Sequence, residues 1–245
     1  MSRSRKLGRR RPTSRGLQAA IVFLVLACAI PTAAEGVATK RMSDERTSTL
    51  VAYVTGRTQV REKPSWSARP VAPLRQTTFS GYPEVVIVLE RTVGGKWSLV
   101  RFAGLGRRVG WVRTSALDDR WRVNTRLVID RRRHRLRLYR RGRVIVTASV
   151  GVGASQSPTP GGRFYVRERL RPPSSDSIYG ALAFGLSAFS RYRTDWPGGG
   201  QVGVHGTNQP ELIPGRISNG CVRLRNERIL KLGRRMPLGT PVLIR

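Results

Sequence analysis

Cys221 and His205 are the two side chains of this sequence best suited to covalent catalysis. A cysteine attacks as its thiolate, and an imidazole is the usual group that removes the thiol proton. Sixteen positions separate the two residues, so the fold rather than local spacing must bring them together. A buried, unreactive thiol is the alternative interpretation of Cys221. The second histidine, His134, lies in a run of arginines, and we expect it to be a solvated residue at a strand end.

The neighbours of Cys221 favour a reactive thiol. If a strand starts at Cys221, its side chain and that of Arg223 lie on one face, and the apolar residues next to them lie on the other. Gly220 allows a tight backbone turn that leaves amide groups facing a substrate oxygen. A cation at Arg223 favours the thiolate. A structural ion pair is the other role that the sequence allows for Arg223.

Two segments together resemble the L,D-transpeptidase catalytic domain. His205-Gly206 is followed by Ser218-Asn219-Gly220-Cys221-Val222-Arg223, which is similar to that family's Ser-x-Gly-Cys-x-Arg motif. Upstream, Thr159-Pro160-Gly161-Gly162-Arg163-Phe164 is similar to its Thr-Pro-x-Gly-x-Phe segment. The resemblance covers about residues 126–245. Many members have a second histidine where this chain has Asn219, so no proton transfer is expected there.

The resemblance implies an exported enzyme that acts on peptidoglycan stem peptides and serves cell-wall biogenesis. Cys221 would attack the bond before the terminal D-alanine of a donor tetrapeptide, form a thioester and release D-alanine. An amine acceptor would then take the acyl group. His205 would act as the base, oriented by the backbone carbonyl of Gly206. Transfer to water instead would make the protein an L,D-carboxypeptidase.

The resemblance also implies how substrate is held. The backbone amides of Gly220 and Cys221 are candidates for the oxyanion hole, and Ser218, Asn219 and Arg223 are candidates for substrate contacts. No metal and no cofactor are expected, because the sequence offers no cluster of metal ligands.

The second half of the chain has the pattern of a mainly β fold. Apolar residues alternate in Leu127–Asp130 and Arg135–Tyr139, Arg141-Gly142 is a turn signal, and Pro241–Ile244 is typical of a closing strand. One helix is predicted, with Asn226 as its N-cap and Gly233 as its stop. Residues 122–245 are therefore expected to be a β-sandwich-like catalytic domain with one or two short helices.

Residues 50–119 are predicted to form a separate small barrel. Short β-rich runs alternate with turn residues, and Gly94-Gly95 is a hairpin signal. Gln59–Ser65, Gly95-Lys96-Trp97 and Gly110-Trp111-Val112 resemble bacterial Src-homology-3-type domains. The barrel is expected to bind the cell wall, and a chain beginning near Arg120 is expected to remain active alone. Residues 35–49 are polar and are predicted to be a flexible linker.

Residues 1–34 have the pattern of a secretory signal peptide. Seven cationic side chains in residues 1–16 precede a mostly apolar run, Leu17–Ile30, and small residues that predict cleavage after Ala34. The alternatives are an uncleaved anchor and lipidation at Cys28. The net charge is +32, and removing seven positive charges leaves +25. We therefore expect export to the periplasm or cell wall, with anionic wall polymers as candidate partners.

The segment from Arg171 to Gly200 has two interpretations. It is either a mobile lid over the site or, through Tyr179, Phe184 and Trp196, part of the core.

Two other functions compete with the enzyme. A non-catalytic wall-binding protein could lack His205 or Cys221, and both are present. A nucleic-acid binder is suggested by charge alone, without a recognition motif or the right compartment.

Overall fold

The computed structural model describes residues 37–105, 108–192 and 199–245, without the side chains of Asp119 and Arg120. The predicted signal peptide and Trp196 lie outside the described residues. Within them the chain is mainly β with one α-helix, which confirms the predicted fold class. No helix of the described part has the length and apolar character that crossing a membrane requires.

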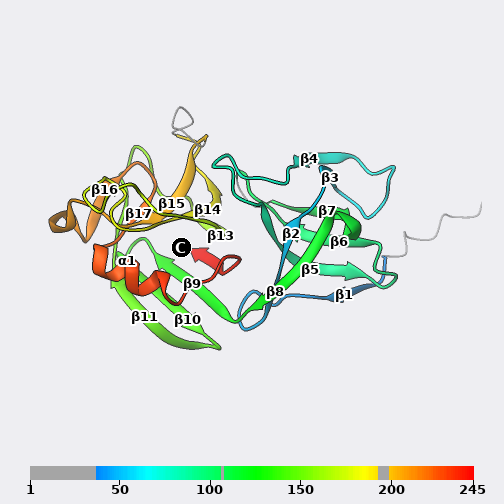
Figure 1. The fold of residues 1–245 in the computed structure, drawn as a ribbon, viewed down its shortest axis with the longest axis horizontal. Coiled ribbons are helices and arrows are strands. Elements are labelled where there is room, and N and C mark those ends of the chain that lie inside the picture. Colours follow the sequence, from blue (N-terminus) through cyan, green and yellow to red (C-terminus); the bar gives the residue numbers. More distant parts are fainter. Residues whose placement is uncertain (1–36, 106–107, 193–198) are drawn as a thin grey trace, which may run out of the picture. The chain divides into compact units, whose positions relative to one another are not determined.

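The first eight strands form an antiparallel sheet (Figure 1). Strand pairing follows the order β4-β3-β7-β6-β5-β2-β8, and β1 pairs with β5. Gly94-Gly95 lies in the β5–β6 hairpin, as predicted, and Gly95 has a φ of 70°. The Src-homology-3-type assignment of this region remains a prediction. The strands are β1 (Thr39–Arg41), β2 (Thr49–Val54), β3 (Thr58–Arg61), β4 (Pro70–Leu74), β5 (Val85–Thr92), β6 (Trp97–Arg101), β7 (Val109–Arg113) and β8 (Leu117–Val123).

The predicted linker, residues 35–49, is not a flexible spacer where the structure describes it. β1 pairs with β5, and the carboxylate of Asp44 accepts hydrogen bonds from the backbone N–H groups of Arg46, Thr47 and Ser48. The segment is ordered because β5 offers a backbone edge to β1 and because the aspartate satisfies the amides of the turn. β8 likewise runs across the predicted domain boundary at residues 119–122.

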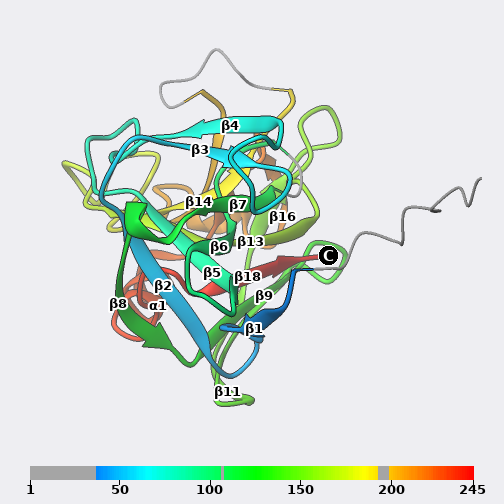
Figure 2. The same cartoon turned by 90° about the vertical axis from the view of Figure 1, so that its right-hand side faces the viewer.

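A second sheet of ten strands carries the candidate catalytic residues (Figures 1 and 2). The strands pair in the order β11-β10-β9-β18-β13-β14-β15-β17-β12-β16. Helix α1 (Asn226–Gly233) buries Ile229 and Leu232 in the core of this sheet. The strands are β9 (Thr125–Asp130), β10 (Arg135–Arg140), β11 (Arg143–Ser149), β12 (Gly151–Gly153), β13 (Gly162–Leu170), β14 (Ala183–Phe189), β15 (Gln201–His205), β16 (Gly215–Ser218), β17 (Val222–Arg223) and β18 (Pro241–Ile244).

Two local predictions in this sheet are wrong. Asn226 is the first residue of α1 rather than its N-cap, and Arg225 occupies the cap position without a side-chain hydrogen bond. The segment from Arg171 to Gly200 is not a lid as a whole, because β14 runs through its middle and pairs with both β13 and β15. Phe184 of β14 is fully buried, as the core alternative expects.

The two sheets share a buried interface. Tyr165 of β13 is fully buried in a cluster with Val51 and Ile87, and its hydroxyl donates to the carbonyl of Val85 at 2.9 Å. Next to it, Nε of Arg167 donates to the Glu84 carboxylate at 2.8 Å, and both side chains are almost completely buried. These contacts argue against the expectation that the second domain acts alone.

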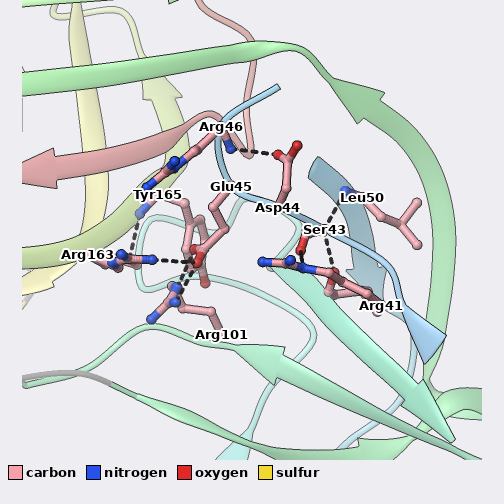
Figure 3. A network of polar contacts seen from close by, with 11 residues as sticks. Arg41, Ser43, Asp44, Glu45, Arg46, Leu50, Arg101, Arg163 and Tyr165 are labelled. Carbon is pink, nitrogen blue, oxygen red and sulfur yellow. Dashed lines mark hydrogen bonds and ion pairs between the residues drawn. The ribbon is translucent and has the colours of Figure 1, made fainter. Parts of the chain in front are cut away.

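Glu45 adds an ionic contact to the same interface. Its carboxylate accepts hydrogen bonds from Arg101 of β6 at 2.7 and 2.8 Å and lies 3.7 Å from the guanidinium of Arg163 on β13. Figure 3 shows both guanidinium groups directed at this carboxylate. Arg101 is 2% exposed, so its charge depends on Glu45 for compensation.

Candidate active site

Parallel strands β15 and β17 bring His205 and Cys221 together. The pairing sets Val204 beside Val222 and His205 beside Arg223, with Cys221 one residue before β17. The alternation of small and β-branched residues in Val202–His205 suits a strand, as does the buried Val222. The sixteen-residue gap is therefore closed by strand pairing.

The imidazole of His205 is buried and held by its own neighbour. The side chain is 4% exposed, and Nδ1 lies 2.6 Å from the carbonyl oxygen of Gly206. A carbonyl can only accept, so Nδ1 carries the proton and Nε2 presents a lone pair. The ring of Tyr179 packs edge-on against the imidazole with a centroid separation of 5.2 Å. This arrangement gives a neutral base with a defined tautomer.

Gly203 provides both a hydrogen bond and space beside the thiol. Its backbone N–H donates to Sγ of Cys221 at 3.3 Å. A Cβ atom on Gly203 would lie 3.7 Å from Sγ and 3.7 Å from Cδ2 of His205, so the sulfur and the imidazole flank one empty position. Our sequence analysis did not identify Gly203. A glycine inside a predicted strand, two residues before His205, often marks a place where a ligand approaches the backbone closely, and this signal could have indicated Gly203.

Burial controls the charges of this pair. Burial lowers the pKa of His205 to about 4. The hydrogen bond to the Gly206 carbonyl acts to raise this pKa, and the charge of Arg223 acts to lower it further. Burial raises the pKa of the Cys221 thiol, while the Gly203 N–H and Arg223 oppose that rise. The resting pair is therefore a neutral thiol and a neutral imidazole at neutral pH.

Ser218 ties the loop before Cys221 into a fixed turn. Its hydroxyl donates to the carbonyl of Cys221 at 2.5 Å and accepts the N–H of Gly220 at 3.2 Å. Gly220 has a φ of 114°, which a residue with a side chain rarely adopts. The amide of Gly220 is thus already donated in this structure, which corrects the prediction that it faces a substrate oxygen. Asn219 is exposed, and its carbonyl accepts a hydrogen bond from Ser157.

Arg223 faces the site with part of its hydrogen-bonding capacity unused. One guanidinium nitrogen, Nη1, lies 3.4 Å from Oε1 of Gln209. Its buried Nε has no hydrogen-bond partner among the described residues. Arg223 lines a cavity that Cys221 also lines, which favours a ligand contact over the structural ion pair.

Asn226 organises the backbone behind His205, a role that the sequence pattern did not indicate. Its side-chain oxygen accepts the N–H groups of Ala181 and Thr207, at 3.0 and 3.2 Å. A Cβ atom on Gly180 or Gly206 would lie only 2.1 or 2.2 Å from that oxygen. Glycine at both positions lets the asparagine hold the two segments that position the imidazole and Tyr179.

Two cavities share His205 and Cys221 as lining residues. The smaller, about 120 Å³, has a mainly apolar lining, and Ser190, Ser218, Asn219 and Arg223 are its polar residues beside the pair and Gln201. The larger, about 350 Å³, extends over β13 and β14. The structure thus brings the seven predicted site residues into one region. His134 lies apart from them, in the turn between β9 and β10.

Comparison with known proteins identifies the class of this second sheet. The model of the L,D-transpeptidase catalytic domain family (YkuD) matches residues 124–244. A Bacillus subtilis protein, named as the L,D-transpeptidase YkuD, is 30% identical over 128 residues, which make up 52% of this chain and 70% of that protein. The chain therefore belongs to the L,D-transpeptidase catalytic domain family.

Other comparisons mark the extent of the similarity. The Bacillus licheniformis protein of the same name is 33% identical over 119 residues, which cover 49% of this chain and 64% of that protein. The chain thus spans a little under two thirds of that relative. The solved structure of Bd1075 from Bdellovibrio bacteriovorus is 28% identical, covering 50% of this chain and 48% of that chain with a TM-score of 0.40. The family match begins after β8, so the first sheet lies outside it.

Proposed function

We propose that this protein is a peptidoglycan transpeptidase with Cys221 as its nucleophile. The donor is a stem tetrapeptide, the leaving group is D-alanine, and the acyl acceptor is an amine. The observation that carries the proposal is the arrangement of the Gly206 carbonyl, the His205 imidazole and the Cys221 thiol on two paired strands. A non-catalytic wall-binding protein has no need of a base with a defined tautomer beside a thiol.

Acylation starts from the neutral pair. Sγ of Cys221 attacks the carbonyl carbon of the bond between the third residue and D-alanine while Nε2 of His205 takes the thiol proton. A C–S bond forms, and the carbonyl oxygen gains the negative charge. The N–H of Cys221 is the candidate donor to this oxyanion, since the amide of Gly220 already donates to Ser218.

The completion of acylation and the later deacylation use the same histidine. The C–N bond breaks as Nε2 of His205 returns its proton to the leaving amine, so D-alanine departs and a thioester remains. An acceptor amine then attacks the thioester, His205 takes one of its protons, and the sulfur leaves and regains that proton. Water in place of the amine gives an L,D-carboxypeptidase, which is the alternative outcome of the same acyl-enzyme.

Arg223 suits the carboxylate of the departing D-alanine. That carboxylate is the group of the donor with a fixed negative charge next to the scissile bond. The side chain of Arg223 lines the 120 Å³ cavity together with Cys221, Ser218 and Asn219, so it offers a cationic donor there. We therefore assign Arg223 to substrate binding.

The first sheet offers a surface for wall polymers. A cavity of about 790 Å³ is lined by the indoles of Trp66 and Trp97 and by the guanidinium groups of Arg57, Arg61, Arg75 and Arg113. The indole of Trp66 is 67% exposed, and the guanidinium carbon of Arg113 lies 5.3 Å from its ring centroid. Exposed aromatic rings and arginines suit an anionic polymer. We assign this sheet to attachment at the wall, outside the cytoplasm, in agreement with the predicted signal peptide.

The test is D-alanine release from a purified tetrapeptide donor. Wild-type protein is expected to release D-alanine and to gain one covalent adduct at Cys221 from a carbapenem, measured by intact mass. The variant Cys221→Ala should do neither while keeping the wild-type thermal unfolding midpoint. D-alanine release by folded Cys221→Ala would overturn the assignment of the nucleophile. A folded wild-type protein with neither activity would favour the wall-binding alternative.

A further inference from the structure

The outer face of one half of the second sheet is lined by arginines. Register sets Arg163 of β13 beside Leu243 of β18. Leu243 pairs with Val128 of β9, which pairs with Arg137 of β10. Because directly paired residues of neighbouring strands point to the same face, these side chains form one row across four strands. The alternate residues of these strands belong to the core on the other face, namely Leu127, Ile129, Leu136, Leu138, Phe164, Val242 and Ile244.

Further charged residues extend this row along the strands. Arg126 precedes the β9 member of the row by two positions, and Arg135 precedes the β10 member by two, so both share its face. The guanidinium of Arg245, directly after β18, lies 3.5 Å from the carboxylate of Asp130 on β9. Residues 131–167 contain no Asp or Glu. The surface formed by Arg126, Arg135, Arg137, Arg163 and Arg245 is called the arginine face below.

Arg126 lies in this face without a compensating anion. Its side chain is half-buried and makes no hydrogen bond or ion pair with the described residues. Burial lowers the pKa of its guanidinium, and the charges of Arg46, Arg163 and Arg245 lower that pKa further. The free protein therefore holds these cations together against their mutual repulsion, and a bound anion relieves it.

Three of these cations line a cleft beside the arginine face. The cleft is lined by Arg46, Arg126 and Arg163 and has a volume of about 20 Å³, which is room for roughly one or two atoms of the size of a water molecule. Glu45 also lines it, but its carboxylate already accepts two hydrogen bonds from Arg101 (Figure 3). The cleft therefore fits the oxygen atoms of one small anionic group rather than a whole ligand.

Phosphate is the anion that suits this arrangement. The three guanidinium groups of the cleft come from three segments of the chain, namely the turn after β1, strand β9 and strand β13. A phosphate group offers oxygen atoms in a tetrahedral arrangement to donors from several directions, whereas both oxygens of a carboxylate lie in one plane. More than one phosphate is needed to cover the face, because Arg163 and Arg137 are three strand spacings of about 4.8 Å apart, roughly 14 Å in all.

We propose that the arginine face binds a polymer of phosphate groups, with one phosphate held in the cleft by Arg46, Arg126 and Arg163. This is a second polyanion site, on the sheet of the active site, and it does not depend on the proposed transpeptidase activity. A flexible polymer suits the face better than a membrane surface does, because a sheet twists by about 20–25° per strand and a flexible chain follows that twist.

The experiment measures the binding of a labelled linear polyphosphate by fluorescence anisotropy. All proteins carry Trp66→Ala, which weakens the first-sheet cavity as a competing site. Arg126→Gln should raise the dissociation constant about 10-fold or more relative to this parent, as expected for the loss of a hydrogen bond to a charged group. The slope of the logarithm of the binding constant against that of the salt concentration should decrease in magnitude by about one, because one phosphate contact is lost.

Arg216→Gln is the matched control, because Arg216 is an exposed arginine of β16, at the opposite edge of the sheet. It should change the dissociation constant by less than threefold. Arg137→Gln should weaken binding as Arg126→Gln does, and it carries the test if Arg126→Gln does not fold. Equal losses in Arg126→Gln and Arg216→Gln would mean that net charge alone attracts the polymer, which would overturn the proposal.

Thermal unfolding tests the repulsion behind the proposal. Without polyphosphate, Arg126→Gln should have an unfolding midpoint no lower than that of its parent, because it removes a repelled cation. With polyphosphate, the midpoint of the parent should rise by more than that of Arg126→Gln, because a ligand stabilises most the protein that binds it most tightly. Either a lower midpoint without polyphosphate or an equal rise with it would overturn the proposal.

Two other anions test the nature of the partner. Polyglutamate of equal charge should bind more weakly than polyphosphate, and vesicles of anionic phospholipid should not bind through Arg126. Equal or tighter binding of polyglutamate, or vesicle binding that Arg126→Gln abolishes, would overturn the phosphate polymer as the partner. None of these measurements uses D-alanine release, so a failure of the proposed function is seen separately.

Discussion

At the residue scale, burial keeps His205 and Cys221 uncharged. A buried imidazole with a pKa near 4 is a base over most of the pH range, and the Gly206 carbonyl directs its free Nε2 away from the backbone. The thiol is protonated at rest, so it needs this base at the moment of attack. In the mechanism that we propose, the pair works by general-base catalysis rather than as a preformed thiolate and imidazolium.

The pH profile should reflect this state. Because burial lowers the pKa of His205, kcat/KM for acylation should fall on the acid side through about pH 4 rather than near pH 6.5. Arg223→Gln removes a cation that disfavours imidazole protonation, so its acid limb should move to higher pH and stay below 6.5. A stopped-time assay of D-alanine release between pH 3 and 8 checks both. A shift of the acid limb to lower pH in the variant would contradict the assigned effect of Arg223.

The two histidines provide a matched pair for the base. His205→Ala should slow acylation by about 10²- to 10⁴-fold, the usual contribution of a positioned base. His134→Ala alters a turn residue outside both active-site cavities and should change the rate by less than threefold. Single-turnover acylation of both variants measures this contrast. Equal effects would require another base.

At the element scale, two glycines facing each other on β14 and β15 shape the site. Gly185 and Gly203 are partners in the strand register; Gly203 leaves space beside Cys221, and Gly185 leaves space for the side chains of Gln201 and Glu168. Register decides this feature, since a shift by one residue would place apolar side chains over the thiol.

Gly203→Ala should fold and yet impair catalysis. The new Cβ would meet its nearest neighbour, the carbonyl oxygen of Phe184, at 3.3 Å, which small shifts can relieve. It would occupy the space between Sγ and the imidazole, so we expect acylation to slow by at least tenfold with a similar unfolding midpoint. Gly56→Ala adds a methyl group where no atom lies within 4 Å, and it should leave acylation unchanged. Wild-type acylation by Gly203→Ala would show that substrate does not need this space.

At the scale of the whole molecule, the two sheets are joined through buried charge as well as apolar packing. Glu84 of the first sheet pairs with Arg167 of the second, and both are shielded from solvent. Removal of one partner leaves the other charge buried without compensation, whereas removal of both does not.

Glu84→Gln should therefore lower the free energy of unfolding by about 3–5 kcal/mol, and the double variant Glu84→Leu with Arg167→Met should lose much less. Chemical denaturation of the full chain measures both. Equal losses in the single and double variants would mean that this pair does not couple the sheets. A large loss in Glu84→Gln would also predict that a chain beginning near Arg120 lacks a stable second sheet.

Attachment to the wall is a separate property that we propose for the first sheet. Arg113→Gln and Trp66→Ala should weaken sedimentation with purified sacculi, and wild-type binding should fade with salt because exposed charges are screened over about 10 Å at 0.1 M. D-alanine release from a soluble donor should not change. Arg143→Gln, an exposed arginine on β11, is the control for charge alone. Unaltered sacculus binding in both variants would leave this cavity without the role assigned to it.

The sequence by itself determined the class of the protein and predicted its reactive pair. The motifs around His205 and Cys221, the strand patterns and the hairpin turns are local signals, because alternation and turn chemistry depend on residues that are close in the chain. The same local signals placed Pro241–Ile244 in a closing strand. They failed for Asn226, whose side chain binds backbone groups distant in sequence. They also failed for residues 35–49, where β1 is ordered by pairing with the distant strand β5.

Only the tertiary structure decided which groups meet. Pairing of β15 with β17 closes the gap between His205 and Cys221, and the Ser218 hydroxyl accepts a hydrogen bond from the amide of Gly220. These features depend on long-range pairing and on burial, which no local pattern encodes. Burial then sets the charge of each group, because the cost of desolvation depends on everything packed around it.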